Sequence, residues 1–124
     1  MVGVAGKAFT VIHGLDGYDE ISLTNDTKVI TNEGEKIKTT IELGKRFVDP
    51  EAIYGGNTTE EAAKIFLKII TGEGSWAQNA VVLANAAMAL QCTGNYENYE
   101  HAYNAAVDSL DNGRAYTVLQ KLIS

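Results

Sequence analysis

The spacing of apolar residues changes once along this chain, and this change constrains the fold more than any other feature. In the first third, short runs alternate apolar and polar residues or are rich in β-branched ones, which is typical of strands. From Thr58 onward, apolar residues recur every three or four positions, which indicates amphipathic helices. Strands first and helices after predict the α+β fold class.

Short segments of the first third have strand character. Residues 8–12 are β-branched and aromatic and end at His13 and Gly14, which predicts a buried strand that stops at a turn. The other segments are residues 21–24, 28–31 and 37–41. Turn residues at positions 31–36 join the last two, so we expect a β-hairpin there. Residues 42–56 have no sustained period and are predicted as a loop or a short turn of helix.

About four helices are predicted in the remaining two-thirds, and the first two have clear start signals. Thr58 and Ser75 are each followed three residues later by a residue of the capping-box type, Glu61 and Gln78. Residues 81–90 of the second helix are apolar nearly all round, which predicts a buried helix. Glycines at positions 72 and 94 should end these two helices.

The last two predicted helices each carry one apolar stripe. The first stripe runs from Tyr99 to Leu110, and Asn112 and Gly113 break it. The final stripe consists of Ala115, Val118, Leu119 and Leu122. We therefore expect the helices to supply most of the core.

Length and composition favour one globular domain, residues 1–124. Hydrophobic residues make up 45% and charged residues 21% of the 124 residues, which is ordinary for a chain that folds. The formal charge of -6 disfavours nucleic acid and anionic membranes as partners because both would be repelled. The apolar segments are far shorter than the roughly 18 residues that a membrane span needs.

The single cysteine, Cys92, has no partner within the chain for a disulfide. The sequence also opens with residues 1–6, MVGVAG, rather than with a basic stretch followed by a long apolar run. Both features favour a reducing, cytoplasmic location.

The densest polar cluster follows the first predicted strand. It contains His13, Asp16, Asp19 and Glu20, with two glycines between them. Ligands in open α/β sheets collect at the carboxyl ends of strands. Three carboxylates within five residues repel one another unless solvent or a cation screens them. Mg2+ is one such cation, because it takes one or two carboxylates together with waters and substrate phosphates.

The spacing leaves two interpretations of this cluster open. Asp19 and Glu20 would point to opposite faces of a regular strand, so they can share one ion only where the backbone is irregular. A solvated acidic turn that enters the next strand is the more common outcome. His13 is suited to general acid or base chemistry, but no serine or cysteine nucleophile stands beside it. A structural, hydrogen-bonded role is therefore favoured for His13.

Residues 11–24, VIHGLDGYDEISLT, followed by residues 27–29, resemble the hallmark segment of the anthranilate phosphoribosyltransferase family. Further segments resemble the C-terminal region of that family in the same order along the chain: residues 54–56, 61–63, 72–74, 81–90 with the Asn-Ala-Ala at 85–87, and 111–113 with Ala115. The resemblance runs from about residue 8 to the end of the chain.

The resemblance implies a transferase that joins anthranilate to phosphoribosyl pyrophosphate and releases diphosphate, in tryptophan biosynthesis. It implies that Asp19 and Glu20 bind the Mg2+ ions that accompany the diphosphate. It also implies that the chain folds like the C-terminal part of the family's α/β catalytic domain. It assigns no catalytic or substrate-binding residue in this chain beyond the two acids.

The family's helical N-terminal region, its glycine-rich diphosphate loop and its further substrate-binding residues have no counterpart in these 124 residues. We therefore expect a C-terminal fragment that is inactive alone and needs the missing N-terminal portion as a partner. The alternative is a non-catalytic remnant that acts as a protein-interaction module. Either would leave an apolar face uncovered, which predicts a homo-oligomer.

Overall fold

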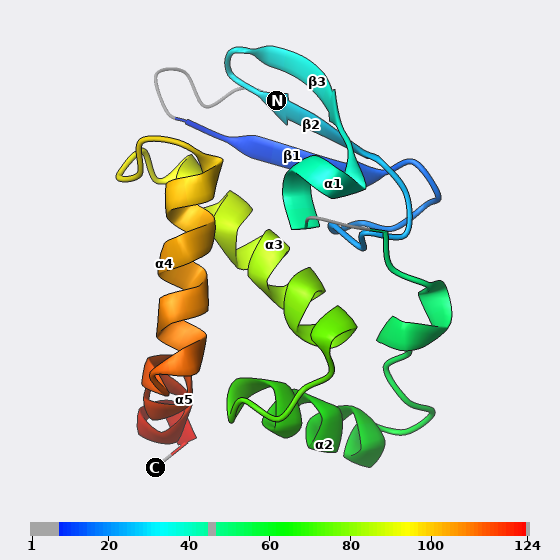
Figure 1. Ribbon diagram of the computed structural model, residues 1–124, viewed down its shortest axis with the longest axis vertical. Coiled ribbons are helices and arrows are strands. Elements are labelled where there is room, and N and C mark those ends of the chain that lie inside the picture. Colours follow the sequence, from blue (N-terminus) through cyan, green and yellow to red (C-terminus); the bar gives the residue numbers. More distant parts are fainter. Residues whose placement is uncertain (1–7, 45–46, 124) are drawn as a thin grey trace.

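The computed structural model describes residues 8–44 and 47–123, and it has strands at the start and helices after them (Figure 1). The predicted α+β class is confirmed. The strands are β1 (Thr10–Gly14), β2 (Thr27–Thr31) and β3 (Gly34–Lys38). The helices are α1 (Thr40–Gly44), the short 3-10 helix η1 (Pro50–Ile53), α2 (Thr59–Ile70), α3 (Trp76–Cys92), α4 (Tyr99–Asp111) and α5 (Arg114–Ile123).

The described strands form one antiparallel sheet in the order β1-β2-β3. Thr31 pairs with Gly34 at the tip of the β2–β3 hairpin, so the predicted hairpin is confirmed. Its bounds differ from the prediction, because the turn is at residues 32–33 and the second strand is at 34–38 rather than at 37–41, where Ile41 belongs to α1. Gly34 has a φ of 130°, which a glycine adopts without the strain that a side chain would cause. At the opposite end of the sheet, Gly14 of β1 pairs with Thr27 of β2.

Two predictions about the first third are wrong. Residues 21–24 are not a strand; they form an irregular segment in which every residue is buried. Leu23 has a φ of 63°, which is rare for a residue with a side chain and breaks the extended backbone. β1 is not a buried strand either, because it lies at the edge of the sheet that the described strands form and Val11 is 51% exposed.

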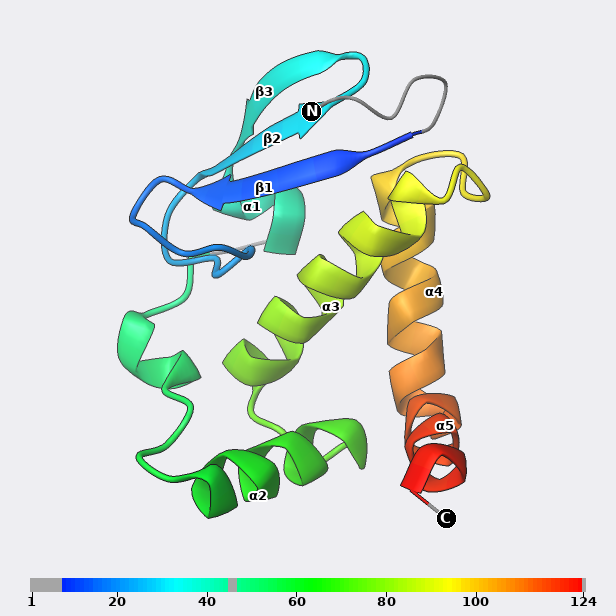
Figure 2. The same cartoon turned by 180° about the vertical axis from the view of Figure 1, so that it is seen from behind.

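The core lies between the sheet and α3, and the irregular segment contributes to it. Its buried residues are Ile21, Leu23, Val29, Leu43, Val48, Ala80, Ala84 and Met88. Figures 1 and 2 show α3 running diagonally below the sheet, with α4 alongside it and α2 at the end away from the sheet. α3 also contacts α1 and η1. α3 therefore packs against both the sheet side of the core and the helices around it.

The predicted helix starts are confirmed, although only one has a complete capping box. The Ser75 hydroxyl accepts from the Gln78 amide, and the Gln78 side chain accepts from the Ser75 amide. Thr58 accepts from the Glu61 amide at 3.1 Å, but the Glu61 carboxylate accepts from the backbone of residue 57 rather than of Thr58. The glycines at 72, 94 and 113 all have positive φ at the ends of α2, α3 and α4.

The apolar helix faces are less covered than their sequences predict. The apolar run at residues 81–90 predicts that α3 is buried all round, yet Val82 in this run is 41% exposed. No residue of α2 or α5 is fully buried, and Phe66 and Leu122 are 50% and 76% exposed. The expected uncovered apolar face is therefore present on α2 and α5. None of the described helices is both long and apolar enough to cross a membrane.

Candidate functional site

The three acids of the polar cluster lie in the connection between β1 and β2, residues 15–26, which we call the acid loop, and His13 lies in β1. Its first turn is held by backbone hydrogen bonds: the Gly14 amide donates to the Tyr18 carbonyl at 2.8 Å, and the Gly17 amide donates to the Gly14 carbonyl at 2.9 Å. Leu15 donates to the carbonyl of Asp26 at 3.0 Å, which ties the start of the loop to its end. The acid loop is therefore a fixed turn that extends the β1–β2 pair.

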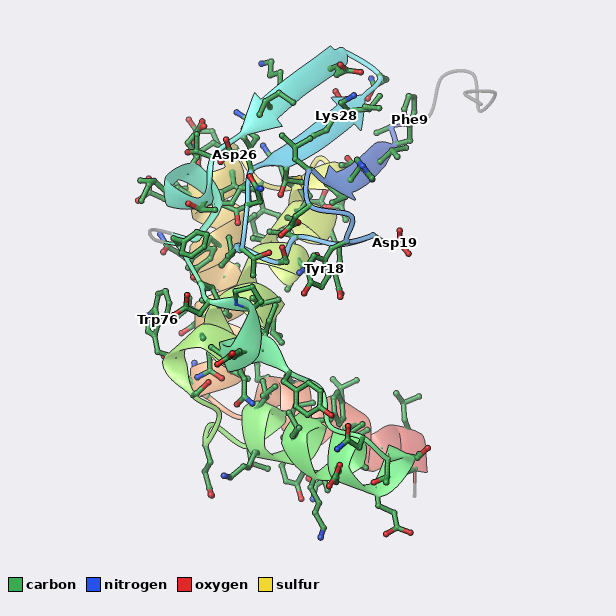
Figure 3. The ribbon with its side chains drawn as sticks, turned by 90° about the vertical axis from the view of Figure 1, so that its right-hand side faces the viewer. Phe9, Tyr18, Asp19, Asp26, Lys28 and Trp76 are labelled. Atoms are coloured by element: carbon green, nitrogen blue, oxygen red, sulfur yellow. The ribbon has the colours of Figure 1, made fainter. Side chains whose placement is uncertain are left out.

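Asp19 and Glu20 lie on the outside of the acid loop, in a bend rather than in a strand. Both are exposed, and among the described residues neither side chain has a hydrogen bond or an ion pair. Figure 3 shows Asp19 at the outer edge of the molecule, pointing away from the sheet and the helices. The irregular backbone that two neighbouring acids need in order to share an ion is thus present here.

Asp16 differs from the other two acids because its carboxylate has a hydrogen-bonding partner. Its carboxylate accepts from the Thr24 hydroxyl at 2.5 Å, and that hydroxyl is 2.6 Å from the hydroxyl of Ser22. Because the Thr24 proton goes to the carboxylate, Ser22 donates to Thr24. The Asp16 carboxylate is therefore hydrogen-bonded across the acid loop to Thr24, whereas the carboxylates of Asp19 and Glu20 have no partner among the described residues.

The two outer acids suit Mg2+ but do not enclose it. Mg2+ keeps several waters and takes only one or two protein carboxylates, its other ligands being substrate phosphates. Two neighbouring carboxylates without a cationic partner supply that donor set. Among the described residues no group of three or more His, Cys, Asp and Glu side chains is placed to hold a metal ion. The donor set therefore fits an ion shared with a phosphate ligand rather than a closed protein cage.

His13 lies on the exposed side of β1, one residue before Gly14. Within the described residues its ring has no hydrogen bond or ion pair, so the hydrogen-bonded role that the sequence favours is not supported. The serine nearest to His13 in sequence, Ser22, is buried and bonded to Thr24. No nucleophile and base are paired in this cluster.

Two cavities of about 350 Å³ each lie between the sheet and α3, and neither is lined by Asp19 or Glu20. Both are lined in part by Met88 and Cys92. The acids therefore lie on an open surface of the described chain. The rule that ligands collect at the carboxyl ends of parallel strands does not place them there, because the described strands are antiparallel.

Asn85 of α3 is hydrogen-bonded to the acid loop, a contact that the sequence does not predict. The Ile21 amide donates to its Oδ1 at 2.9 Å, and its Nδ2 donates to the Ile21 carbonyl at 2.7 Å. A signal was present, because Asn85 is the one polar residue in the apolar run 81–90. A buried polar side chain in such a run needs a hydrogen-bonding partner.

Comparison with known families supports the resemblance that the sequence shows. The family model described as "Glycosyl transferase family, a/b domain" matches residues 1–116. Among curated proteins, the chain is 46% identical to an anthranilate phosphoribosyltransferase of Flavobacterium johnsoniae, over 92% of this chain and 34% of that protein. It is 47% identical to one of Bacteroides thetaiotaomicron, over 93% of this chain and 35% of that protein.

The fold matches a solved structure as well. Anthranilate phosphoribosyltransferase from Thermus thermophilus aligns with a TM-score of 0.81 and 26% identity, over 92% of this chain and 34% of that one. The chain thus spans about a third of the length of the relatives it matches. Because the family model covers nearly the whole sequence, the chain belongs to the glycosyl transferase family defined by this α/β domain, as a homologue of anthranilate phosphoribosyltransferases.

Proposed function

We propose that this chain forms part of an anthranilate phosphoribosyltransferase and that Asp19 and Glu20 bind its Mg2+. The observation that carries the proposal is the pair of neighbouring acids, exposed and without a cationic partner among the described residues, on a loop that is otherwise closed by hydrogen bonds. The names of the relatives supply anthranilate and a phosphoribosyl group, and the resemblance of residues 11–24 implies phosphoribosyl pyrophosphate as the donor of that group. A cytoplasmic location goes with this proposal.

Charge supports a metal between these acids and a diphosphate group. The chain carries a net charge of -6, so carboxylates alone would repel a diphosphate. When bound, Mg2+ supplies charge stabilisation at the departing diphosphate. The work of this chain is then to hold the two carboxylates of Asp19 and Glu20 outward at a fixed place.

The remaining parts of the reaction site lie outside the described residues. The acids line neither cavity of the described chain, and the relatives are about three times as long as this chain. We infer that the missing portion of such an enzyme holds the ribose and the anthranilate against the acid loop. The chain alone should therefore have little or no transferase activity.

A fusion protein tests this function. The matching third of the Flavobacterium johnsoniae relative is replaced by this chain, and formation of phosphoribosylanthranilate is measured. We expect an active fusion whose rate falls at least about 100-fold in Asp19→Asn or Glu20→Gln, because charge stabilisation by a metal is worth several kcal/mol.

Glu33→Gln is the matched control. Glu33 is an exposed acid in the hairpin turn, at the end of the sheet opposite the acid loop, so the control fusion should keep its rate. A folded fusion without activity, or one whose rate is the same in Asp19→Asn as in Glu33→Gln, would contradict the proposed function.

An interaction module is the second candidate, and the exposed stripes of α2 and α5 favour it. In this case the chain forms a homo-oligomer through these faces, and Asp19 plays no part. Sedimentation at increasing concentration should then show association that Phe66→Ser weakens and Asp19→Asn leaves unchanged. A monomer at all concentrations would contradict self-association.

A further inference from the structure

The side chain of Asn85 behaves towards Ile21 as a neighbouring strand would. It accepts from the Ile21 amide at 2.9 Å and donates to the Ile21 carbonyl at 2.7 Å, across 64 positions of the sequence. Its second amide hydrogen goes to the carbonyl of Val81, at 2.8 Å, in its own helix. Both amide hydrogens and the oxygen of Asn85 are thus used, and they fix the side chain relative to α3.

Ile21 needs this partner because it lies in an irregular, buried segment. Residues 21–24 are buried and belong to no strand, so no ladder supplies their backbone hydrogen bonds. Buried backbone amides and carbonyls are costly when unpaired. Asn85 pairs both polar backbone groups of Ile21, whose side chain is fully buried.

The bonds of Asn85 place Asp19 and Glu20 between two fixed points. On one side, the Tyr18 carbonyl accepts from Gly14 at the end of β1. On the other side, Ile21 is held by α3 through Asn85. The acids are the two residues between these points. Further along, Leu23 adopts its left-handed backbone and accepts from the Val48 amide at 2.8 Å, which keeps the segment from sliding.

We propose that Asn85 is a positioning residue that fixes the backbone of Asp19 and Glu20 by holding Ile21 against α3. This inference rests on the proposed function only for its effect on metal binding. The backbone effect stands by itself, so the experiment measures the two separately.

The first measurement is amide hydrogen exchange of the full chain. In Asn85→Ala, the Ile21 amide should exchange at least about tenfold faster relative to the amides of β2, because it loses its acceptor. Ser75→Ala is the matched control, since it removes the capping box of the same helix without touching the acid loop. It should lower protection of Ile21 and of β2 to the same extent.

The second measurement is the affinity of Mn2+, as a stand-in for Mg2+, in the presence of inorganic pyrophosphate. Asn85→Ala should weaken binding by about 10-fold to 100-fold, as loss of a residue that orients a metal ligand typically does, and Ser75→Ala should not. Where Asn85→Ala does not fold, Asn85→Gln takes its place. It keeps the uncharged amide group but displaces it by one methylene, which weakens the pairing with Ile21, so an intermediate loss of affinity is expected.

The outcomes separate the two proposals. No Mn2+ binding by the unaltered chain overturns the metal role of the acids, and hydrogen exchange then decides the inference alone. Faster exchange of Ile21 relative to β2 supports the positioning role of Asn85. Unchanged relative exchange overturns that role, and metal affinity that falls equally in Asn85→Ala and Ser75→Ala overturns its effect on metal binding.

Discussion

The side chain of Leu23 packs directly onto the Cα of Gly44, and this contact joins the acid loop to α1. A Cβ added at Gly44 would lie 2.8 Å from Leu23 Cδ2, and it would meet Cδ1 more closely still. Leu23 is fully buried and has a φ of 63°, so its side chain is enclosed against Gly44 and its backbone leaves the extended conformation. The three residues between Asp19 and Leu23 therefore have little freedom.

Gly44→Ala should lower the free energy of unfolding. Overpacking a closed contact costs about 1–3 kcal/mol, whereas alanine regains at most about 1 kcal/mol over glycine in a helix. The cost of the overpacked contact therefore exceeds the gain in helix propensity, and denaturant unfolding should show a net loss in the free energy of unfolding. Gly55→Ala is the control because nothing lies within 4 Å of its added Cβ; equal stability of the two variants would show that the Leu23 contact is not closed.

Gly17→Ala tests the turn that begins the acid loop. Gly17 has a φ of 103°, and nothing lies within 4 Å of a Cβ added there, so any cost comes from the backbone alone. We expect a loss of about 1–2 kcal/mol in unfolding free energy, measured by denaturant unfolding against Gly55→Ala. A variant as stable as the unaltered chain would mean that the loop adopts another turn.

Tyr99→Phe tests the link between α4 and α1. The Tyr99 hydroxyl donates to the Leu43 carbonyl at 2.5 Å, and its loss should cost about 1–2 kcal/mol because that carbonyl is left without its donor. Tyr116→Phe is the control, since no hydrogen bond of the Tyr116 hydroxyl occurs among the described residues. Thermal or denaturant unfolding should rank Tyr99→Phe as the less stable variant; the reverse order would be inconsistent with this link.

The stability of the fold should also depend on pH through Tyr99. Burial, and to a lesser extent the charge of Tyr103, raises the pKa of Tyr99 well above its ordinary value near 10. Its folded-state pKa is raised, so its stabilising contribution is full below about pH 10 and is lost as the pH rises further. The stability measured between about pH 9.5 and 11 should therefore fall less in Tyr99→Phe than in Tyr116→Phe, and parallel curves for the two variants would exclude this role.

Local signals predicted the parts of the fold that local chemistry determines. The capping box of Ser75 and the β2–β3 hairpin depend on residues within a few positions of one another, and both are confirmed. Residues 21–24 alternate in the same way as a strand, but their conformation depends on Asn85 and Gly44, which are distant in sequence. No local pattern contains that information.

The same reason explains what the sequence could predict of the candidate site. The resemblance singled out Asp19 and Glu20, and the structure places both on an exposed, irregular turn. The hydrogen bonds of Asp16 to Thr24 and of Asn85 to Ile21 depend on the tertiary fold, so local sequence patterns do not predict them. The exposure of the α2 and α5 stripes likewise depends on what packs against them, which their periodicity does not state.

Paramagnetic line broadening by Mn2+, with inorganic pyrophosphate present, shows whether Asp19 and Glu20 bind the metal. We expect the amide signals of Asp19 and Glu20 to broaden first, with Mg2+ reversing the effect by competition. Glu33→Gln should leave that broadening intact, and the double variant Asp19→Asn, Glu20→Gln should abolish it. Broadening that persists at these positions in the double variant, or that is confined to another part of the chain, would contradict the account.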